Sequence, residues 1–180
     1  MKKTRLITVT AMLSAMAVAL QFIGSVAPLP KIGGFLEIEF SDIPAIIGSL
    51  SMGPLCGVLI EFIKNVIHLT VSTTGFVGEF ANFVVNGIYV LVLGLIYNRK
   101  KTKKMAMVGF LAAIISYSFI GAYVNYYVML PFFNYPEQYR LGLVLMTITP
   151  FNIVKGLALA IITLLVYKKL SPIIKGKTIY

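Results

Sequence analysis

Asn152 and Lys155 have the types and spacing expected of ligand-binding residues. They lie in the stretch PFNIVKG, residues 150–156, which opens an otherwise uncharged apolar run that continues to Tyr167. Because they are three residues apart, they share one face of a helix. We expect the start of that helix to add free N–H groups and partial positive charge, which suits a ligand with carbonyl acceptors. No acidic residue neighbours them in sequence, so a proton-coupled carboxylate relay is disfavoured.

Other polar residues also recur at helical spacing. They are Glu61, Lys64, Asn65 and His68 in one run, Glu79, Asn82 and Asn86 in the next, and Asn125 among tyrosines. Ionisable groups within a bilayer face a partner or a cavity. They could instead be polar bridges between helices, as Glu61 with Lys64, or lysines that reach the membrane surface. For the lone His68 a structural role is favoured.

Two further patterns each allow two interpretations. Tyrosines crowd the run around Asn125, at residues 117, 123, 126 and 127. They form either an interfacial belt or a wall for a flat aromatic ligand. Ala11, Ala15 and Ala19 have a four-residue spacing, which lets another helix approach closely. The partner helix belongs either to this chain or to another protein.

Composition indicates an integral membrane protein. The chain has 180 residues, of which 58% are hydrophobic and only 12% charged, with several long apolar runs. This length excludes a large soluble catalytic domain. The net charge of +10 comes from basic residues at the ends of apolar runs, which predicts membrane topology and not a nucleic-acid partner. One cysteine and one histidine predict neither a disulfide within the chain nor a metal site.

The elements that position these residues are predicted to be six transmembrane helices in one all-α domain, residues 1–180. The predicted spans are 6–23, 43–51, 54–69, 80–97, 105–130 and 143–167. A break at Ser51–Met52–Gly53–Pro54 divides the long apolar region 43–69 into two short helices. If that region lies in the membrane without crossing it, four spans result, and we prefer six. The basic start resembles a signal peptide, and we interpret it as a retained first helix.

The positive-inside rule places both termini and the basic run 99–104 in the cytoplasm. The segments 24–42, 70–79 and 131–142 are then outer loops. Within the first, FLEIEF alternates apolar and acidic residues, which predicts a short strand-like segment. The outer loops and the polar start of the last helix therefore converge on one mouth.

The motifs EFSDIPA, KNVIHL, GEFAN and PFNIVKG, in this order after an alanine-spaced first helix, resemble a known family. It is the substrate-binding S component of energy-coupling factor (ECF) vitamin transporters, of the riboflavin-binding type. The resemblance covers nearly the whole chain. It implies a bacterial cell-membrane protein with six helices, an outward-facing riboflavin pocket, no cofactor and no catalytic activity. Its implied partners are a transmembrane coupling protein and two ATPases, which would supply the ATP hydrolysis.

The resemblance also implies roles for individual residues. The polar residues of the last motif would bind the flavin ring, which carries over to Asn152 and Lys155. An equivalent asparagine maps to Asn125. The FLEIEF and GEFAN segments would line the pocket through residues Leu36, Glu39, Gly78 and Asn82. The alanines of the first helix, Ala11, Ala15 and Ala19, would contact the coupling protein.

Three other functions compete with this interpretation. A different vitamin, such as thiamine, biotin or a queuosine-type precursor, would keep the architecture and change only the ligand. A membrane-embedded enzyme would need clustered acids or a His/Ser/Cys constellation, and the six acids and one histidine argue against it. An independent small carrier is disfavoured by the short length and the absence of repeated halves.

Overall fold

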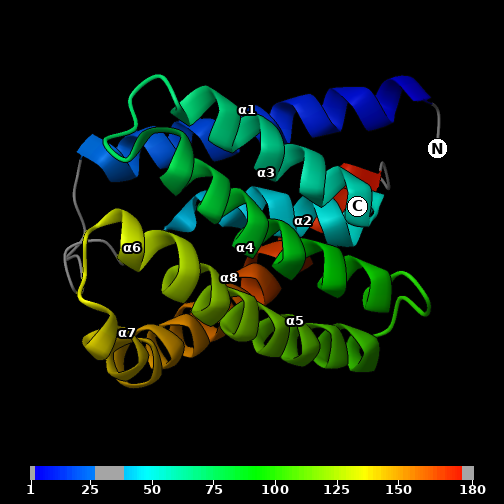
Figure 1. Ribbon diagram of the computed structural model, residues 1–180. Helices are drawn as coiled ribbons and strands as arrows, with labels where there is room; N and C mark the ends of the chain where they lie inside the picture. The colour runs from blue at the N-terminus through cyan, green and yellow to red at the C-terminus, as the bar shows by residue number, and fades with distance from the viewer. Residues whose placement is uncertain (1–2, 27–38, 176–180) are drawn as a thin grey trace.

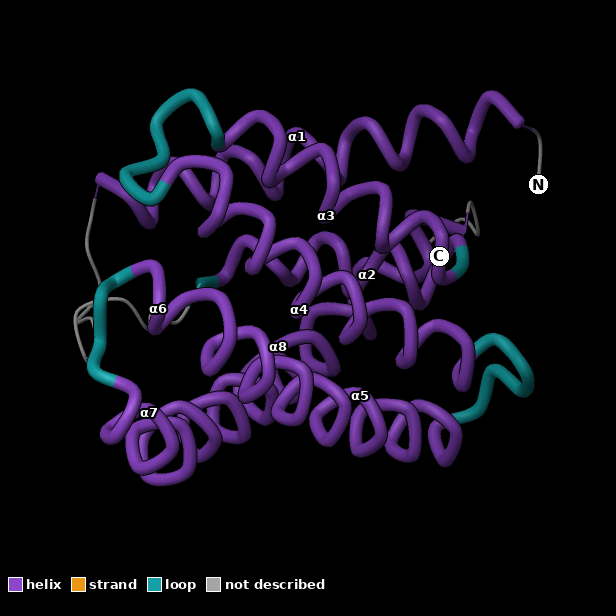
Figure 2. The backbone as a smooth tube through the Cα atoms, in the orientation of Figure 1, coloured by secondary structure: helices purple, strands orange, loops and turns teal. Residues whose placement is uncertain are grey.

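The computed structural model of the chain describes residues 3–26 and 39–175, and these form a bundle of helices (Figure 1). The described residues contain helices and connecting loops but no strand (Figure 2). The α-helices are α1 (Lys3–Val26), α2 (Ile43–Met52), α3 (Pro54–His68), α4 (Gly75–Tyr97), α5 (Lys103–Val124), α6 (Leu130–Phe132), α7 (Glu137–Leu143) and α8 (Thr149–Lys175). Three short elements join them: the 3₁₀-helix η1 (Phe40–Asp42) and the π-helices η2 (Asn125–Met129) and η3 (Val144–Ile148).

The described elements make a bundle of six helical segments, as predicted, because η2 continues α5 into α6 and η3 continues α7 into α8. Four stretches are long and apolar enough to span a bilayer: Lys3–Gly24, Gly75–Tyr97, Lys103–Phe132 and Glu137–Tyr167. The other two, α2 and α3, are shorter. Almost all of α2 is buried among its neighbours, which explains how a helix of 10 residues is accommodated without facing lipid along its length.

The break predicted between the two short helices is present at Gly53. This residue ends α2 and precedes α3, and its φ of 118° lies in a region that side chains other than glycine rarely adopt. Pro54 then opens α3, where its missing N–H is not needed. The chain reverses here, so that α3 returns antiparallel to α2 (Figure 2).

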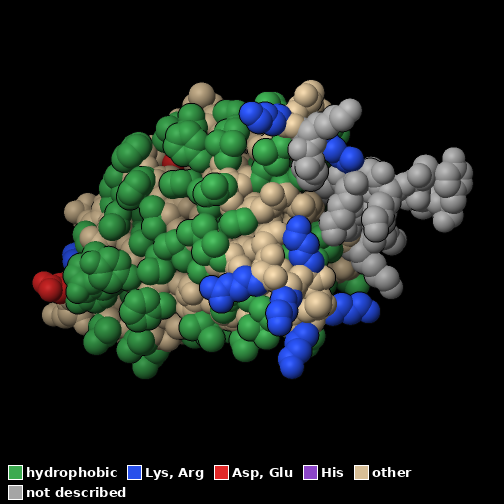
Figure 3. Space-filling view, turned by 90° about the vertical axis from the view of Figure 1, so that its right-hand side faces the viewer, with side chains coloured by type: hydrophobic (Ala, Val, Ile, Leu, Met, Phe, Trp, Pro, Cys, Tyr) green, Lys and Arg blue, Asp and Glu red, His purple; other side chains and the backbone are tan. Residues whose placement is uncertain are grey.

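The two ends of the bundle differ in charge. The start of α1, the α4–α5 loop and the end of α8 lie at one end, and the α3–α4 and α6–α7 loops lie at the other (Figure 1). Basic side chains gather on the surface at the end that holds the α4–α5 loop (Figure 3). The exposed ones include Arg99, Lys100, Lys101, Lys103 and Lys104. This distribution agrees with the predicted cytoplasmic position of both termini.

Some predicted boundaries differ from those observed. The outer segment 131–142 is not a loop, because α6 and α7 occupy most of it and leave only 133–136 as the turn. Likewise α4 begins at Gly75, within the predicted loop 70–79. Most of the predicted strand-like FLEIEF lies outside the described residues. Of its last two residues, Glu39 is extended (φ −105°, ψ 131°) and Phe40 already begins η1.

Candidate ligand-binding site

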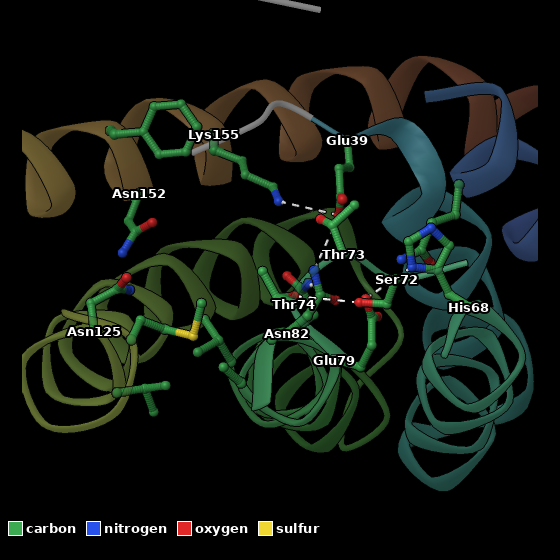
Figure 4. A pocket seen from close by; sticks show the side chains of 18 of the residues that line it. Glu39, His68, Ser72, Thr73, Thr74, Glu79, Asn82, Asn125, Asn152 and Lys155 are labelled. Carbon is green, nitrogen blue, oxygen red and sulfur yellow. Dashed lines mark hydrogen bonds and ion pairs between the residues drawn. The ribbon is translucent and has the colours of Figure 1, made fainter. Parts of the chain in front are cut away.

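A cavity of about 440 Å³ opens among the outer ends of the helices. Figure 4 shows it with side chains converging from α1, α3, α4, α5, α8 and the segments before η1 and α4. Its size falls in the range of about 300–1,000 Å³ that small-molecule sites occupy. The predicted site residues that line it are Asn152, Lys155, Asn125, Glu39, Gly78 and Asn82, whereas Leu36 lies outside the described residues.

Asn152 is buried in the cavity wall and is only 4% exposed. Its Nδ2 has no hydrogen-bond partner among the described residues. The side chain points towards Asn125 (Figure 4), whose own Nδ2 donates to the carbonyl oxygen of Gly121 at 2.7 Å. Asn125 begins the π-helix η2, an irregularity often found at functional sites. The two asparagines therefore lie side by side in the cavity wall, and the amide nitrogen of Asn152 is left without a partner among the described residues.

Lys155 lies one helical turn beyond Asn152 and is 5% exposed. Its Nζ is 3.4 Å from Oδ2 of Asp42 and 3.9 Å from Oε2 of Glu39. Both distances exceed the 2.7–2.9 Å typical of a well-formed ammonium–carboxylate hydrogen bond. The ammonium group is therefore neutralised by carboxylates, and it retains N–H groups for a ligand acceptor.

The expectation that a helix N-terminus contributes charge at Asn152 and Lys155 is wrong. The stretch Glu137–Tyr167 is one continuous helix, so both residues lie in its interior, where backbone N–H groups are already bonded. Proline usually breaks a helix in its interior, and Pro150 lies only two residues before Asn152. Here the π-helix η3 immediately precedes α8 and lets the chain pass Pro150 without ending the helix. Lys155, which lines the cavity, supplies the positive charge there.

A chain of polar side chains forms the floor of the cavity. Asn82 donates from Nδ2 to Oε2 of Glu39 at 3.2 Å, and Asn86 donates to Oδ1 of Asn82 at 2.9 Å. Asn86 also lines the cavity and is not among the predicted site residues, although its four-residue spacing from Asn82 places both on one helix face. These hydrogen bonds tie α4 to the segment that precedes η1, and all three residues line the cavity.

The opposite end of the cavity is rich in hydroxyl groups. Ser72, Thr73 and Thr74 line it from the α3–α4 loop. His68 lines it too, and its Nδ1 lies 2.9 Å from Oε1 of Glu79 (Figure 4). The sequence favoured a structural role for His68, and this contact between α3 and α4 fits such a role. The three hydroxyl residues were missed because a loop carries no periodic signal.

The aromatic lining of the cavity also differs from the one considered from sequence. Tyr117 lines the cavity with Phe133 and Phe151. Tyr123 and Tyr127 are instead 59% and 62% exposed on the outer surface of the bundle. Their position favours the interfacial belt for these two residues, and the apolar wall comes from Tyr117 and the two phenylalanines.

Glu61 and Lys64 pair with each other, as considered from sequence, at 2.7 Å between Oε2 and Nζ. Both side chains are fully buried. The structure adds Asp42, whose Oδ1 lies 2.5 Å from the same ammonium group. A buried group of three carboxylates and two lysines thus extends from the cavity into the bundle: Glu39, Lys155, Asp42, Lys64 and Glu61.

Comparison with known protein families decides where this fold and cavity belong. The family described as "ECF transporter, substrate-specific component" matches residues 5–167. The chain belongs to this family. The family resemblance inferred from the sequence is therefore confirmed. With its long apolar helices, this ECF substrate-specific component is a multi-pass protein of the bacterial cell membrane. The family is one of transport components, which supports a transporter subunit and not an enzyme.

Individual relatives agree with this family. The riboflavin transporter RibU of Staphylococcus aureus (strain TCH60) is 33% identical over 177 residues, covering 95% of this chain and 92% of the relative. The riboflavin transporter FmnP of Bacillus subtilis (strain 168) is 32% identical over 180 residues, covering 94% of each. A solved structure described as "Structure and mechanism of the S component of a bacterial ECF transporter" superposes with a TM-score of 0.79 at 31% identity. That match covers 97% of this chain and 99% of the solved chain.

Proposed function

We propose that this ECF substrate-specific component binds riboflavin and mediates its uptake across the bacterial cell membrane. Two relatives that match it over nearly their whole length are named riboflavin transporters. The observation that carries the proposal is Asn152 in the cavity wall, whose buried Nδ2 has no hydrogen-bond partner among the described residues. A buried donor without a partner is costly, so a ligand acceptor that satisfies it contributes to affinity.

The chemistry of a flavin suits this end of the cavity. The pyrimidine edge of its ring carries carbonyl acceptors beside an N–H donor. An asparagine side chain both donates and accepts, and a lysine only donates. We place that edge against Asn152, Asn125 and Lys155. The apolar end of the ring would pack on Tyr117, Phe133 and Phe151, which line the same cavity.

The polyhydroxylated ribityl chain needs scattered hydrogen-bond partners. We place it towards Glu39, Asn82 and the α3–α4 loop, where carboxylate, amide and hydroxyl groups line the cavity. In this placement Gly78 lines the cavity beside Thr74, whose side chain occupies the space that a Cβ atom at residue 78 would need. Leu36 stays in the proposed site as a residue outside the described part of the chain.

Transport requires partners, and we infer that they are a transmembrane coupling protein and two ATPases, as in ECF transporters generally. The predicted docking residues Ala11, Ala15 and Ala19 are all exposed along α1, and the intervening Leu13 and Ala17 are buried. Packing within this chain therefore does not account for the alanine spacing. A surface of small residues that is exposed in the isolated chain suits close packing against a helix of a second protein.

The test is purification in mild detergent from cells grown with riboflavin, followed by visible absorption and identification of the released compound. Co-eluting flavin bands, and riboflavin in the released material, are the expected result. A colourless protein that also fails to quench the fluorescence of added riboflavin would exclude the flavin assignment. Thiamine and biotin would then be the next ligands to titrate.

A further inference from the structure

Asp42 joins two buried lysines that come from different helices. It is the last residue of η1, directly before α2, and it is only 2% exposed. Its Oδ1 lies 2.5 Å from Nζ of Lys64 on α3. Its Oδ2 lies 3.4 Å from Nζ of Lys155 on α8 and has no hydrogen-bond partner among the described residues. One carboxylate group therefore faces both ammonium groups.

The two lysines differ in how tightly they are held. Lys64 has two close carboxylate partners, Asp42 at 2.5 Å and Glu61 at 2.7 Å, and it does not line the cavity. Lys155 has only longer contacts with carboxylates and does line the cavity. Lys64 thus anchors Asp42, whereas Lys155 keeps the capacity to bind a ligand.

The position of the Lys155 ammonium depends on these carboxylates. A lysine side chain has a flexible four-carbon stem, so its charged end goes where opposite charges hold it. Glu39 is the more distant partner of Lys155 and is 22% exposed, and its Oε2 also accepts a hydrogen bond from Asn82. Asp42 is the nearer partner, is almost fully buried and is fastened to Lys64. It is the more rigid of the two supports.

We propose that Asp42 is a positioning residue for the ligand: held by Lys64, it keeps the ammonium group of Lys155 directed into the cavity. This inference rests on the proposed function, because it concerns the flavin that Lys155 would bind. Neither Asp42 nor Lys64 is among the residues that line the cavity. A search for ligand-contacting residues would therefore miss the positioning role of Asp42 and the anchoring role of Lys64. The Asp42–Lys64 pair thus affects flavin affinity through Lys155, without contacting the flavin itself.

A double-mutant cycle tests this proposal in the full chain, purified in detergent. The variants are Asp42→Asn, Lys155→Met and the double variant. Riboflavin dissociation constants come from fluorescence quenching, and unfolding temperatures of the ligand-free proteins are measured in parallel. We expect Asp42→Asn to weaken binding by about tenfold or more. In the Lys155→Met background the same change should add less than about twofold, because the group it positions is gone.

Glu61→Gln is the matched control. Glu61 is as deeply buried as Asp42 and contacts Lys64, but the structure shows no contact between it and Lys155. We expect it to lower the unfolding temperature without an equal loss of affinity. Equal losses in Glu61→Gln and Asp42→Asn, or an Asp42→Asn loss that persists in full without Lys155, would overturn the proposal in favour of a structural role.

A second variant covers the case in which Asp42→Asn does not fold. Asp42→Glu keeps the charge and moves it by one methylene group. We expect Asp42→Glu to weaken binding less than Asp42→Asn does. This loss should occur when Lys155 is present and be absent in the Lys155→Met background. No loss, or an equal loss in both backgrounds, would contradict the proposal. The wild-type titration separates the two claims. If the wild type does not bind riboflavin, the proposed function fails. If it binds riboflavin and the losses from the Asp42 and Lys155 changes simply add, only the positioning role of Asp42 is refuted.

Discussion

Gly121 of α5 faces Asn152 of α8 so closely that a Cβ atom at residue 121 would overlap Nδ2 of Asn152. The same glycine accepts a hydrogen bond from Asn125 through its carbonyl oxygen. Gly121 therefore lies behind both asparagines of the proposed flavin site. A side chain introduced at residue 121 would reach neither solvent nor open space, because Gly121 is buried in the α5–α8 interface.

We predict that Gly121→Ala weakens riboflavin binding by about tenfold, because the added methyl group displaces a buried hydrogen-bonding side chain. Fluorescence titration of the purified protein measures the change. Gly142→Ala is the matched control: Gly142 is exposed in α7, and a Cβ atom there would meet nothing within 4 Å. Similar affinities for Gly121→Ala and the wild type would show that Asn152 does not need its present position.

Replacing Asn152 should lower riboflavin affinity more than replacing an asparagine outside the cavity. Asn152→Ala removes the unpartnered donor from the cavity, and we expect a loss of about tenfold or more in riboflavin affinity. Asn98→Ala serves as the comparison. Asn98 follows α4 at the opposite end of the bundle, where its Nδ2 donates to the carbonyls of Gly94 and Ser49. That variant should unfold at a lower temperature and bind riboflavin normally. The reverse pattern would remove Asn152 from the site.

The exposed alanines of α1 predict a separation of binding from assembly. Ala15→Trp adds bulk to the surface proposed for the coupling protein and lies away from the cavity. We expect unchanged riboflavin affinity and loss of co-purification with the coupling protein and ATPases. Leu111→Trp, on a side chain of α5 that is 62% exposed, controls for bulk at a lipid-facing position and should assemble normally. Intact assembly and uptake in Ala15→Trp would place the docking surface elsewhere.

The turn at Gly53 should be sensitive to any side chain. Its φ of 118° is accessible to glycine at low cost and strained for alanine. We predict that Gly53→Ala lowers the free energy of unfolding by about 1 kcal/mol or more. The measurement is thermal unfolding in detergent. Gly24→Ala in α1, where φ is ordinary and no atom lies within 4 Å of the added Cβ, should leave the unfolding temperature unchanged or raise it.

Much of the architecture was predictable because one-dimensional patterns determine it. The apolar runs indicated a membrane protein, since the bilayer demands long uncharged helices. Gly53 and Pro54 predicted the break between α2 and α3 because they restrict the local backbone whatever surrounds them. The shared face of Asn152 and Lys155 followed from helical spacing alone.

The helix boundaries were less accurate where local signals conflicted with packing. The sequence placed Asn152 and Lys155 at the start of their helix, and the structure instead runs through Pro150, just after the π-helix η3, inside one continuous span. The segment 131–142 looks polar and broken, yet most of it is helical. A proline or a short polar run restricts the backbone only locally, and neighbouring helices decide whether it ends a span.

Only the tertiary structure decided which faces meet. Spacing along α3 brought Glu61 and Lys64 together, because residues three apart on a helix are always neighbours. It could not predict that Asp42 lies between Lys64 and Lys155, or that Glu39 accepts from Asn82. Those contacts join residues far apart in the chain, and they depend on how each helix is rotated and how deep it sits in the bundle. The packing of all the side chains together determines that arrangement, and no single segment of sequence contains it.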